Sequence, residues 1–257
     1  MYSDTQIREV FHFCFLDRLL KMSDPSIYVL KGGINLRFFF NSPRYSEDMD
    51  IDVLAGNVST LKKNGYKILT DAAFRRSLRV FDSDDIEIND PGKAKQTKTT
   101  QRFRFGLITR AGQRLPTKIE FSRRAQGTSD DAVMELIDPD IALQYRKLAF
   151  RCQHYGGDVA IVQKVKALAG RAVTQARDVF DLAILYRGGN APSAPLKRLM
   201  PEQELTQAID ALMALSWADY QGQVLEFLVA NSRDEYGDKK AWEWLQTFVL
   251  ESMEADA

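Results

Sequence analysis

Residues 28–53 read YVLKGGINLRFFFNSPRYSEDMDIDV, and this stretch contains the features that decide the fold. A short apolar run typical of a buried strand leads directly into Gly32 and Gly33, and a second apolar run follows. This order predicts a strand, a glycine turn and a helix that ends at the Asn-Ser-Pro sequence of residues 41–43. Residues 45–54 then alternate between polar and apolar side chains, which predicts a strand with one buried face.

Carboxylates line the polar face of that strand. Alternation places Asp48 and Asp50 about 6–7 Å apart on one side of it. Two such groups repel each other unless a cation lies between them, and a hard divalent ion such as Mg²⁺ prefers carboxylate oxygens. The glycine turn presents free backbone N–H groups at a helix N-terminus, which suits a phosphate. Together these features point to nucleotidyl transfer, whereas an Asp-x-Asp pair alone is more often a solvated strand face.

The rest of the chain divides into an α+β half and a helical half. We expect an amphipathic helix over residues 5–21, a helix over 58–80 that is broken near Gly65, and a hairpin over 101–122. The helices expected in the second half are 139–150, 158–173, 177–186, 202–215, 218–230 and 239–253. The sequence therefore predicts an α+β domain over residues 1–130 and a helical domain over residues 131–257.

Composition narrows the class of protein. Hydrophobic residues make up 45% of the chain and charged residues 27%, as in ordinary globular proteins. Lys plus Arg and Asp plus Glu are 35 each, so the net charge indicates no partner. Two distant cysteines and two histidines argue against a disulfide framework, a zinc site and a Ser-His-Asp triad. No apolar run approaches the roughly 18 residues of a membrane span, and we expect a cytoplasmic protein without a membrane partner.

Three blocks of sequence resemble one family. The segments KGGINLR and RYSEDMDID closely resemble the signature of AbiEii-type nucleotidyltransferases, the toxins of bacterial abortive-infection and type IV toxin–antitoxin systems. Residues 118–121, KIEF, are similar to the family's strand with a further acidic residue. QKVKAL and RDVFDL, within residues 163–182, are similar to its lysine helix and the helix that follows. The resemblance implies a DNA-polymerase-β-like α+β core with a mixed sheet, followed by a helical C-terminal domain.

The resemblance also implies roles for individual residues. Asp48 and Asp50 match the ligands of Mg²⁺ or Mn²⁺, and Glu120 matches a third carboxylate that acts as a general base or helps to bind metal. Asp178 matches the catalytic acidic residue of the last motif, with Asp181, one turn later, as the alternative. The implied nucleotide-binding residues are Lys31, Gly32, Gly33, Arg37, Ser46 and Lys164. The second glycine is often Ser or Thr in the wider superfamily, so this chain would rely on backbone N–H groups there.

Helix periodicity does not distinguish the two lysines of residues 158–173. Lys164 and Lys166 flank the apolar face at about 100° on either side. Either side chain could follow the edge of the core and keep its ammonium group in water. The resemblance alone selects Lys164 as the catalytic, nucleotide-contacting lysine, and an ordinary ion pair is the alternative for Asp178.

A basic segment is the candidate for contact with nucleic acid. Its cations are Lys93, Lys95, Lys98, Arg102 and Arg104. Phosphates attract such cations, and Phe103 and Phe105 between them could stack on bases if they are exposed. The alternative is a solvated loop that leads into an ordinary hairpin, with both phenylalanines in the core.

These observations predict a metal-dependent nucleotidyltransferase toxin with an NTP as substrate. In related toxins the acceptor can be the tRNA 3′ end, and a separately encoded antitoxin from a neighbouring gene restores growth. Transfer to a protein or a small molecule is an alternative that shares the glycine turn and the Asp-x-Asp pair. A nucleotide-binding module without catalysis is another, although the complete set of acidic residues argues against it.

Overall fold

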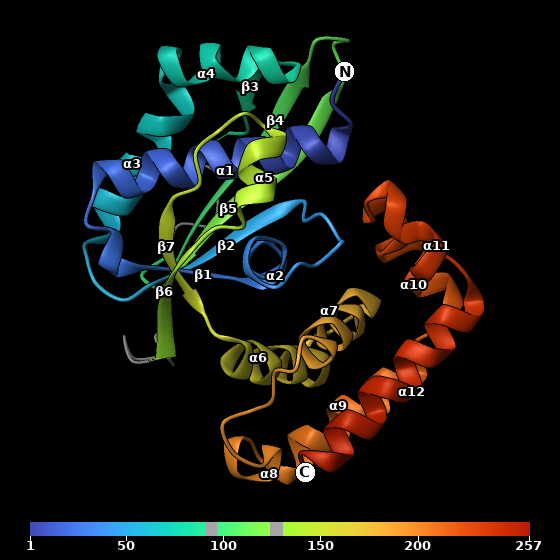
Figure 1. The fold of residues 1–257 in the computed structure, drawn as a ribbon. Coiled ribbons are helices and arrows are strands. Elements are labelled where there is room, and N and C mark those ends of the chain that lie inside the picture. The colour runs from blue at the N-terminus through green and yellow to red at the C-terminus, as the bar shows by residue number, and fades with distance from the viewer. Residues whose placement is uncertain (91–96, 124–130) are drawn as a thin grey trace. The chain divides into compact units, whose positions relative to one another are not determined.

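The computed structural model describes residues 1–90, 97–123 and 131–257, which form two compact units (Figure 1). The first unit comprises Met1–Phe39 and Tyr45–Tyr155, and the second comprises Phe40–Arg44 and Gly156–Ala257. The short segment Phe40–Arg44 therefore belongs to the second unit, although it lies between two elements of the first.

The first unit is an α+β domain. Its helices are α1 (Asp4–Met22), α2 (Gly32–Phe39), α3 (Val58–Thr70), α4 (Ala72–Leu78) and α5 (Pro139–Gln144). Its strands are β1 (Tyr28–Lys31), β2 (Asp48–Val53), β3 (Ser83–Ile88), β4 (Thr100–Thr109), β5 (Arg114–Ser122), β6 (Ala132–Leu136) and β7 (Arg151–Tyr155). The expected sequence of strand, glycine turn, helix and acidic strand is confirmed by β1, α2 and β2.

The seven strands form one mixed sheet in the order β3-β4-β5-β2-β1-β7-β6. Strand β2 is central: it pairs antiparallel with β1 and parallel with β5. Strands β4 and β5 form the expected hairpin. The mixed sheet and the α+β class are thus as the sequence predicted.

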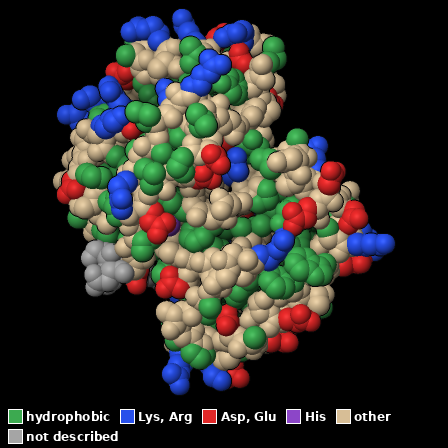
Figure 2. All heavy atoms as spheres, in the orientation of Figure 1, with side chains coloured by type: hydrophobic (Ala, Val, Ile, Leu, Met, Phe, Trp, Pro, Cys, Tyr) green, Lys and Arg blue, Asp and Glu red, His purple; other side chains and the backbone are tan. Residues whose placement is uncertain are grey.

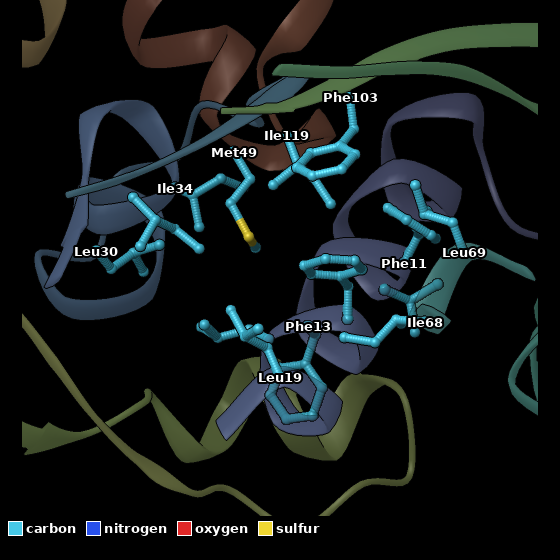
Figure 3. Close-up of a cluster of buried hydrophobic side chains, with 14 of the residues drawn as sticks. Phe11, Phe13, Leu19, Leu30, Ile34, Met49, Ile68, Leu69, Phe103 and Ile119 are labelled. Carbon is cyan, nitrogen blue, oxygen red and sulfur yellow. The ribbon is translucent and has the colours of Figure 1, made fainter. Parts of the chain in front are cut away.

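The hydrophobic core of this unit lies on one face of the sheet. Met49, Ile119 and Phe103 point from β2, β5 and β4 towards helices α1 and α3 (Figure 3). The rings of Phe11 in α1 and Phe105 in β4 have centroids 5.0 Å apart. Phe103 and Phe105 are each 1% exposed, so the expectation that they stack on bases is wrong and the core alternative is correct.

Two boundaries differ from the sequence-based expectation. The first unit extends to Tyr155 instead of ending at residue 130, because β6 and β7 complete the sheet next to β1. Residues 139–150 form only the short helix α5 before β7 begins, instead of one long helix. The expected break near Gly65 is also absent, since α3 continues to Thr70 and Asp71 caps the start of α4.

The second unit is helical, as expected. Its helices are α6 (Gly157–Gly170), α7 (Ala176–Arg187), α8 (Leu196–Leu199), α9 (Glu202–Ala214), α10 (Trp217–Gln223), α11 (Arg233–Tyr236) and α12 (Lys239–Ala255). The N–H of Val229 donates to the carbonyl of Pro43 at 2.9 Å, which ties the segment Phe40–Arg44 to these helices. Among the helices that the structure describes, none is both long and apolar enough to cross a membrane.

The close packing of α3 on β4 generates a stability prediction. A Cβ atom at Gly65 would lie 2.5 Å from Cζ of the buried Phe103 ring. Alanine favours a helix by about 1 kcal/mol over glycine, but overpacking a core costs about 1–3 kcal/mol. We expect Gly65→Ala to lower the free energy of unfolding in urea.

The matched control is Gly222→Ala in α10, where a Cβ atom would meet nothing within 4 Å. This substitution should leave stability unchanged or raise it slightly. Equal stabilisation by both substitutions would contradict the packing argument.

Candidate active site

Charged side chains form two cross-strand rows on the polar face of the sheet, opposite Met49 and Ile51. Register pairs place residues of neighbouring strands next to each other with their side chains on the same face. One row runs across β1, β2, β5 and β4 as Lys31, Asp50, Glu120 and Arg102. The next runs across β2, β5 and β4 as Asp48, Lys118 and Arg104. The register thus brings together Asp48, Asp50 and Glu120, as the sequence predicted.

Asp48 is held by its neighbour on β5. The Lys118 ammonium lies 2.6 Å from Oδ2 of Asp48, and the backbone N–H of Lys118 donates to Oδ1 at 3.2 Å. Ser46, expected to contact nucleotide, donates its hydroxyl to the carbonyl of Asp48 at 3.0 Å. Polar contacts with Ser46 and Lys118 therefore fix the start of β2.

Asp50 lies against the glycine turn. Burial raises the pKa of Asp50 above its usual range; Lys118 and Lys31 oppose this, and the neighbouring carboxylates add to it. Gly32 has φ +71°, and a Cβ atom there would lie 3.3 Å from Oδ2 of Asp50. Position 32 therefore favours glycine for two reasons: its backbone is left-handed, and a carboxylate lies close to where a side chain would begin.

The other two carboxylates of the face, Glu120 and Asp52, are paired. Arg102 Nε donates to Oε2 of Glu120 at 2.5 Å. Asp52 forms an ion pair with Lys31 and accepts a hydrogen bond from the Tyr155 hydroxyl at 2.8 Å. Arg102, expected to contact nucleic acid, thus anchors the third carboxylate instead of standing free in solvent.

Arg37 has a structural contact that the sequence did not reveal. Its Nε lies 2.5 Å from Oε2 of Glu9, a carboxylate that is 1% exposed and also accepts from Tyr145 at 2.6 Å. Its guanidinium carbon lies 4.9 Å from the centroid of the Tyr45 ring. These contacts hold α2 to α1, and they give Arg37 a role besides the expected one in nucleotide binding.

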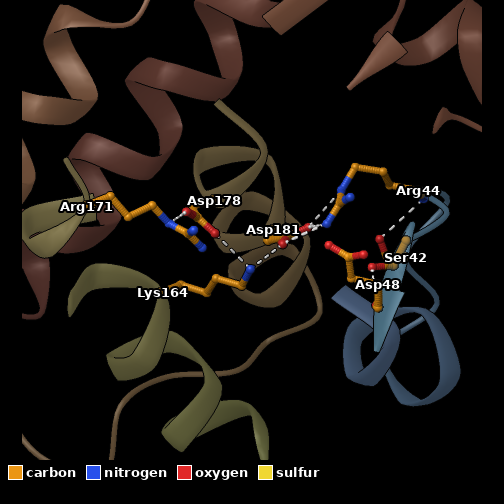
Figure 4. A network of polar contacts seen from close by, with 8 residues as sticks. Ser42, Arg44, Asp48, Lys164, Arg171, Asp178 and Asp181 are labelled. Carbon is orange, nitrogen blue, oxygen red and sulfur yellow. Dashed lines mark hydrogen bonds and ion pairs between the residues drawn. The ribbon is translucent and has the colours of Figure 1, made fainter. Parts of the chain in front are cut away.

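The second unit contains a buried network of charges on α6, α7 and the segment Phe40–Arg44 (Figure 4). Lys164 Nζ lies 2.9 Å from Oδ1 of Asp178 and 2.5 Å from Oδ2 of Asp181. Arg44 Nη2 lies 2.9 Å from Oδ1 of Asp181, and Arg171 Nε lies 2.8 Å from Oδ2 of Asp178. Both carboxylates are fully buried, so each requires these cations.

The network fixes the charge of its members. Burial alone would lower the pKa of Lys164, but Asp178 and Asp181 outweigh it and raise that pKa. Burial would raise the pKa of Asp181, yet Arg44 and Lys164 hold it below its usual range. Lys164 therefore remains an ammonium and Asp181 a carboxylate.

The structure separates the two lysines that periodicity left equivalent. Lys164 is 8% exposed and bound to two aspartates, whereas Lys166 on the same helix is only partly buried. Sequence reasoning missed Arg44 and Arg171 as partners of these aspartates. That Lys164 and Asp178 act together with the carboxylates of the first unit stays a prediction.

The basic segment is only partly described. Lys93 and Lys95 lie outside the described residues, and Lys98 is exposed. Arg104 is exposed on β4, next to Lys118. On the face drawn in Figure 2, basic and acidic side chains both occur, so charge alone marks no acceptor surface there.

The carboxylates of β2 suit a magnesium ion that takes only some of its ligands from the protein. Within the described ranges, no three His, Cys, Asp or Glu side chains are grouped closely enough to enclose a metal. Mg²⁺, however, is commonly bound by one or two carboxylates, with water and substrate phosphates as its other ligands. Asp48 and Asp50 offer such a pair, provided that the ion displaces the Lys118 ammonium from Asp48.

Comparison with known structures supports the fold. MenT4, a nucleotidyltransferase toxin from Mycobacterium tuberculosis, is 17% identical, with a TM-score of 0.61 over 98% of this chain and 84% of that one. The protein JHP933 from Helicobacter pylori is 16% identical, with a TM-score of 0.54 over 99% of this chain and 95% of that one. Comparison with curated protein sequences gives no match.

The family is shown by a model that covers most of the sequence. The model for the AbiEii toxin, a nucleotidyl transferase of type IV toxin–antitoxin systems, matches residues 14–242. That range includes the glycine turn, the acidic strand and the charge network of the second unit. The chain is therefore a nucleotidyltransferase that belongs to the AbiEii toxin family of type IV toxin–antitoxin systems.

Proposed function

We propose that the chain transfers a nucleotide from an NTP to an RNA acceptor, specifically the tRNA 3′ end, with Mg²⁺ or Mn²⁺ as cofactor. The observation that carries this proposal is the grouping of Asp48, Asp50 and Glu120 on one sheet face, beside the glycine turn at Gly32. The family implies an antitoxin partner, and we propose that a neighbouring gene encodes it. A reaction that uses NTP and tRNA would take place in the cytoplasm.

The reaction joins the acceptor to the nucleotide and releases pyrophosphate. The oxygen of the acceptor hydroxyl attacks the α-phosphorus of the NTP, the bond from that phosphorus to the bridging oxygen breaks, and the hydroxyl proton leaves. An ion bound by Asp48 and Asp50 would neutralise phosphate charge and activate the attacking hydroxyl. Backbone N–H groups at the start of α2 would hold a phosphate of the NTP.

Charged residues of the sheet face, and Lys164 of the second unit, would assist this step. Glu120 is next to Asp50 in the sheet register, and Arg102 keeps its carboxylate in place, so Glu120 is the proposed acceptor of the hydroxyl proton. Lys31 precedes the glycine turn and would bind a phosphate after leaving Asp52. Lys164 would bind a phosphate as a point charge, while Asp178 and Asp181 position its ammonium.

The first test removes a proposed metal ligand. Asp48→Ala should abolish transfer of radiolabel from an NTP to RNA, and also growth arrest, because two carboxylates hold the ion. The ion pair with Lys118 is partly exposed, so its loss should cost less than about 1 kcal/mol of stability. Chelation with EDTA should stop the wild-type reaction, and added Mg²⁺ should restore it.

The matched control is Asp85→Ala, which removes a strand aspartate paired with Arg75 at 2.8 Å outside the site. This variant should retain full activity. Full toxicity of a folded Asp48→Ala protein would refute the proposed metal site. Labelling of a protein or a small molecule, with no labelling of RNA, would show that RNA is not the acceptor.

The second test concerns the lysine of α6. We expect Lys164→Ala to weaken NTP binding far more than Lys166→Ala in a nucleotide titration. It should also lower the stability of the second unit by about 3–5 kcal/mol, because it leaves buried carboxylates without a cation. Lys164→Arg, which keeps a cation for the carboxylates, provides a folded variant for the titration.

Circular dichroism verifies folding before each titration. Equal loss of NTP affinity in the Lys164 and Lys166 variants would contradict the assignment. Unchanged affinity in a folded Lys164→Ala protein with reduced stability would leave Lys164 with a structural role alone.

The third test concerns the basic segment. Replacing Lys93, Lys95 and Lys98 together with alanine should weaken transfer to tRNA, while binding of NTP and metal stays unchanged. For every phosphate that the variant no longer neutralises, the salt dependence of its binding to single-stranded RNA should fall by about 0.7 of a slope unit. Labelling of total RNA at low and moderate salt measures the transfer. Unchanged labelling at both salt concentrations would mean that these lysines are solvated and do not contact the acceptor.

A further inference from the structure

A pocket of about 240 Å³ opens beside Asp48 in the first unit. Three basic residues, Arg104, Arg114 and Lys118, contribute to its lining. Its acidic lining residues, Glu47 and Asp48, already have basic partners: Arg8 lies 3.6 Å from Glu47, and Lys118 lies 2.6 Å from Asp48. Of the three basic residues, Lys118 pairs with Asp48 and Arg114 with Glu87, which leaves Arg104 as the uncompensated cation of the pocket among the described residues, and this excess positive charge suits an anion.

Arg114 is held in place by contacts within the sheet. Its side chain lies across Gly106 of β4, where a Cβ atom would be 2.5 Å from Cγ of Arg114. Its Nη2 donates to Oδ1 of Asn89 at 2.5 Å, and its Nε lies 3.3 Å from Glu87. Because the glycine leaves room for the side chain and Asn89 orients it, binding would lose little side-chain entropy at this position.

The other two cations differ in whether they are free to bind a ligand. Arg104 is exposed, and the described residues show no side-chain partner for it. Its cross-strand neighbour Lys118 is bound to Asp48. A divalent ion on Asp48 would displace the Lys118 ammonium, which would then lie beside Arg104 at the pocket. Occupation of the metal site and anion binding in the pocket would thus support each other.

The position of the pocket indicates which anion it binds. Strand β2 separates the glycine turn, on the β1 side, from the pocket, on the β5 and β4 side. In phosphoryl transfer the attacking and leaving oxygens lie roughly in line, on opposite sides of the phosphorus. With the NTP phosphates at the glycine turn, a phosphate on the opposite side of Asp48 belongs to the acceptor.

We propose that Arg104, Arg114 and Lys118 bind a backbone phosphate of the acceptor RNA next to its reacting 3′ end. The proposal rests on the proposed function, since it takes RNA as the acceptor. It adds an acceptor contact within the folded sheet, directly beside the proposed metal ligands.

The test compares RNA binding with NTP binding. Fluorescence anisotropy measures the affinity of wild type and Arg104→Ala for a short labelled single-stranded RNA with a free 3′-hydroxyl, in Mg²⁺ and at several salt concentrations. The variant should bind the RNA about threefold to tenfold more weakly, with a salt slope lower by about 0.7. Its affinity for the NTP, measured by titration, should not change, and Arg104→Lys should retain much of the RNA affinity.

The matched control is Arg76→Ala, which removes an exposed arginine from α4 and changes the net charge by the same amount. RNA affinity that falls equally in both alanine variants, or does not fall in Arg104→Ala, overturns the proposal. Loss of NTP affinity in Arg104→Ala would assign the pocket to the NTP and also overturns it.

Transfer of radiolabel to RNA by the wild type tests RNA as the acceptor independently of the pocket. If the wild type labels RNA and Arg104→Ala binds RNA normally, the pocket assignment fails alone. If the wild type labels no RNA, the proposed acceptor fails, and the pocket assignment fails with it.

Discussion

The parallel pairing of β2 with β5 is the constraint on which the functional face depends. It places Asp48 beside Lys118 and Asp50 beside Glu120, and the pairing of β5 with β4 extends each row to an arginine. A shift by one residue would turn the charged side chains into the core and the apolar ones into solvent. The packing of Met49 and Ile119 under α1 and α3 therefore also fixes the geometry of the carboxylates.

In the second unit, ion pairs between side chains, and not strand register, determine the positions of the charged groups. Asp178 and Asp181 are completely buried, and cations from two separate segments compensate them: Lys164 and Arg171 from α6 and its C-cap, and Arg44 from the segment Phe40–Arg44. An unpaired buried carboxylate would be strongly destabilising. The pairing of Arg44 with Asp181 thus explains why the segment Phe40–Arg44 belongs to this unit.

Local patterns predicted the elements near the site, whereas contacts between distant residues were not accessible to them. Period-two alternation identified β2, and the position of Gly32 and Gly33 identified the turn. The same reasoning missed β7, because His154 looks polar in the sequence although it is buried in the structure. Its Nδ1 shares a hydrogen bond of 2.9 Å with Oδ1 of Asn35, and its ring stacks on that of Phe39 with the centroids 3.6 Å apart. Periodicity also left Lys164 and Lys166 equivalent, since only Asp178 and Asp181 on the next helix distinguish them.

The ion pairs of the sheet face leave one carboxylate incompletely compensated. Lys118 binds Asp48, Arg102 binds Glu120, and Lys31 binds Asp52. Asp50 forms no ion pair within the described ranges, and burial raises its pKa. A divalent ion would add the charge that this carboxylate lacks, and it would at the same time release Lys118 from Asp48. The other carboxylates of the face are therefore paired within the fold, and the proposed cation would add positive charge at Asp50, where the described residues form no ion pair.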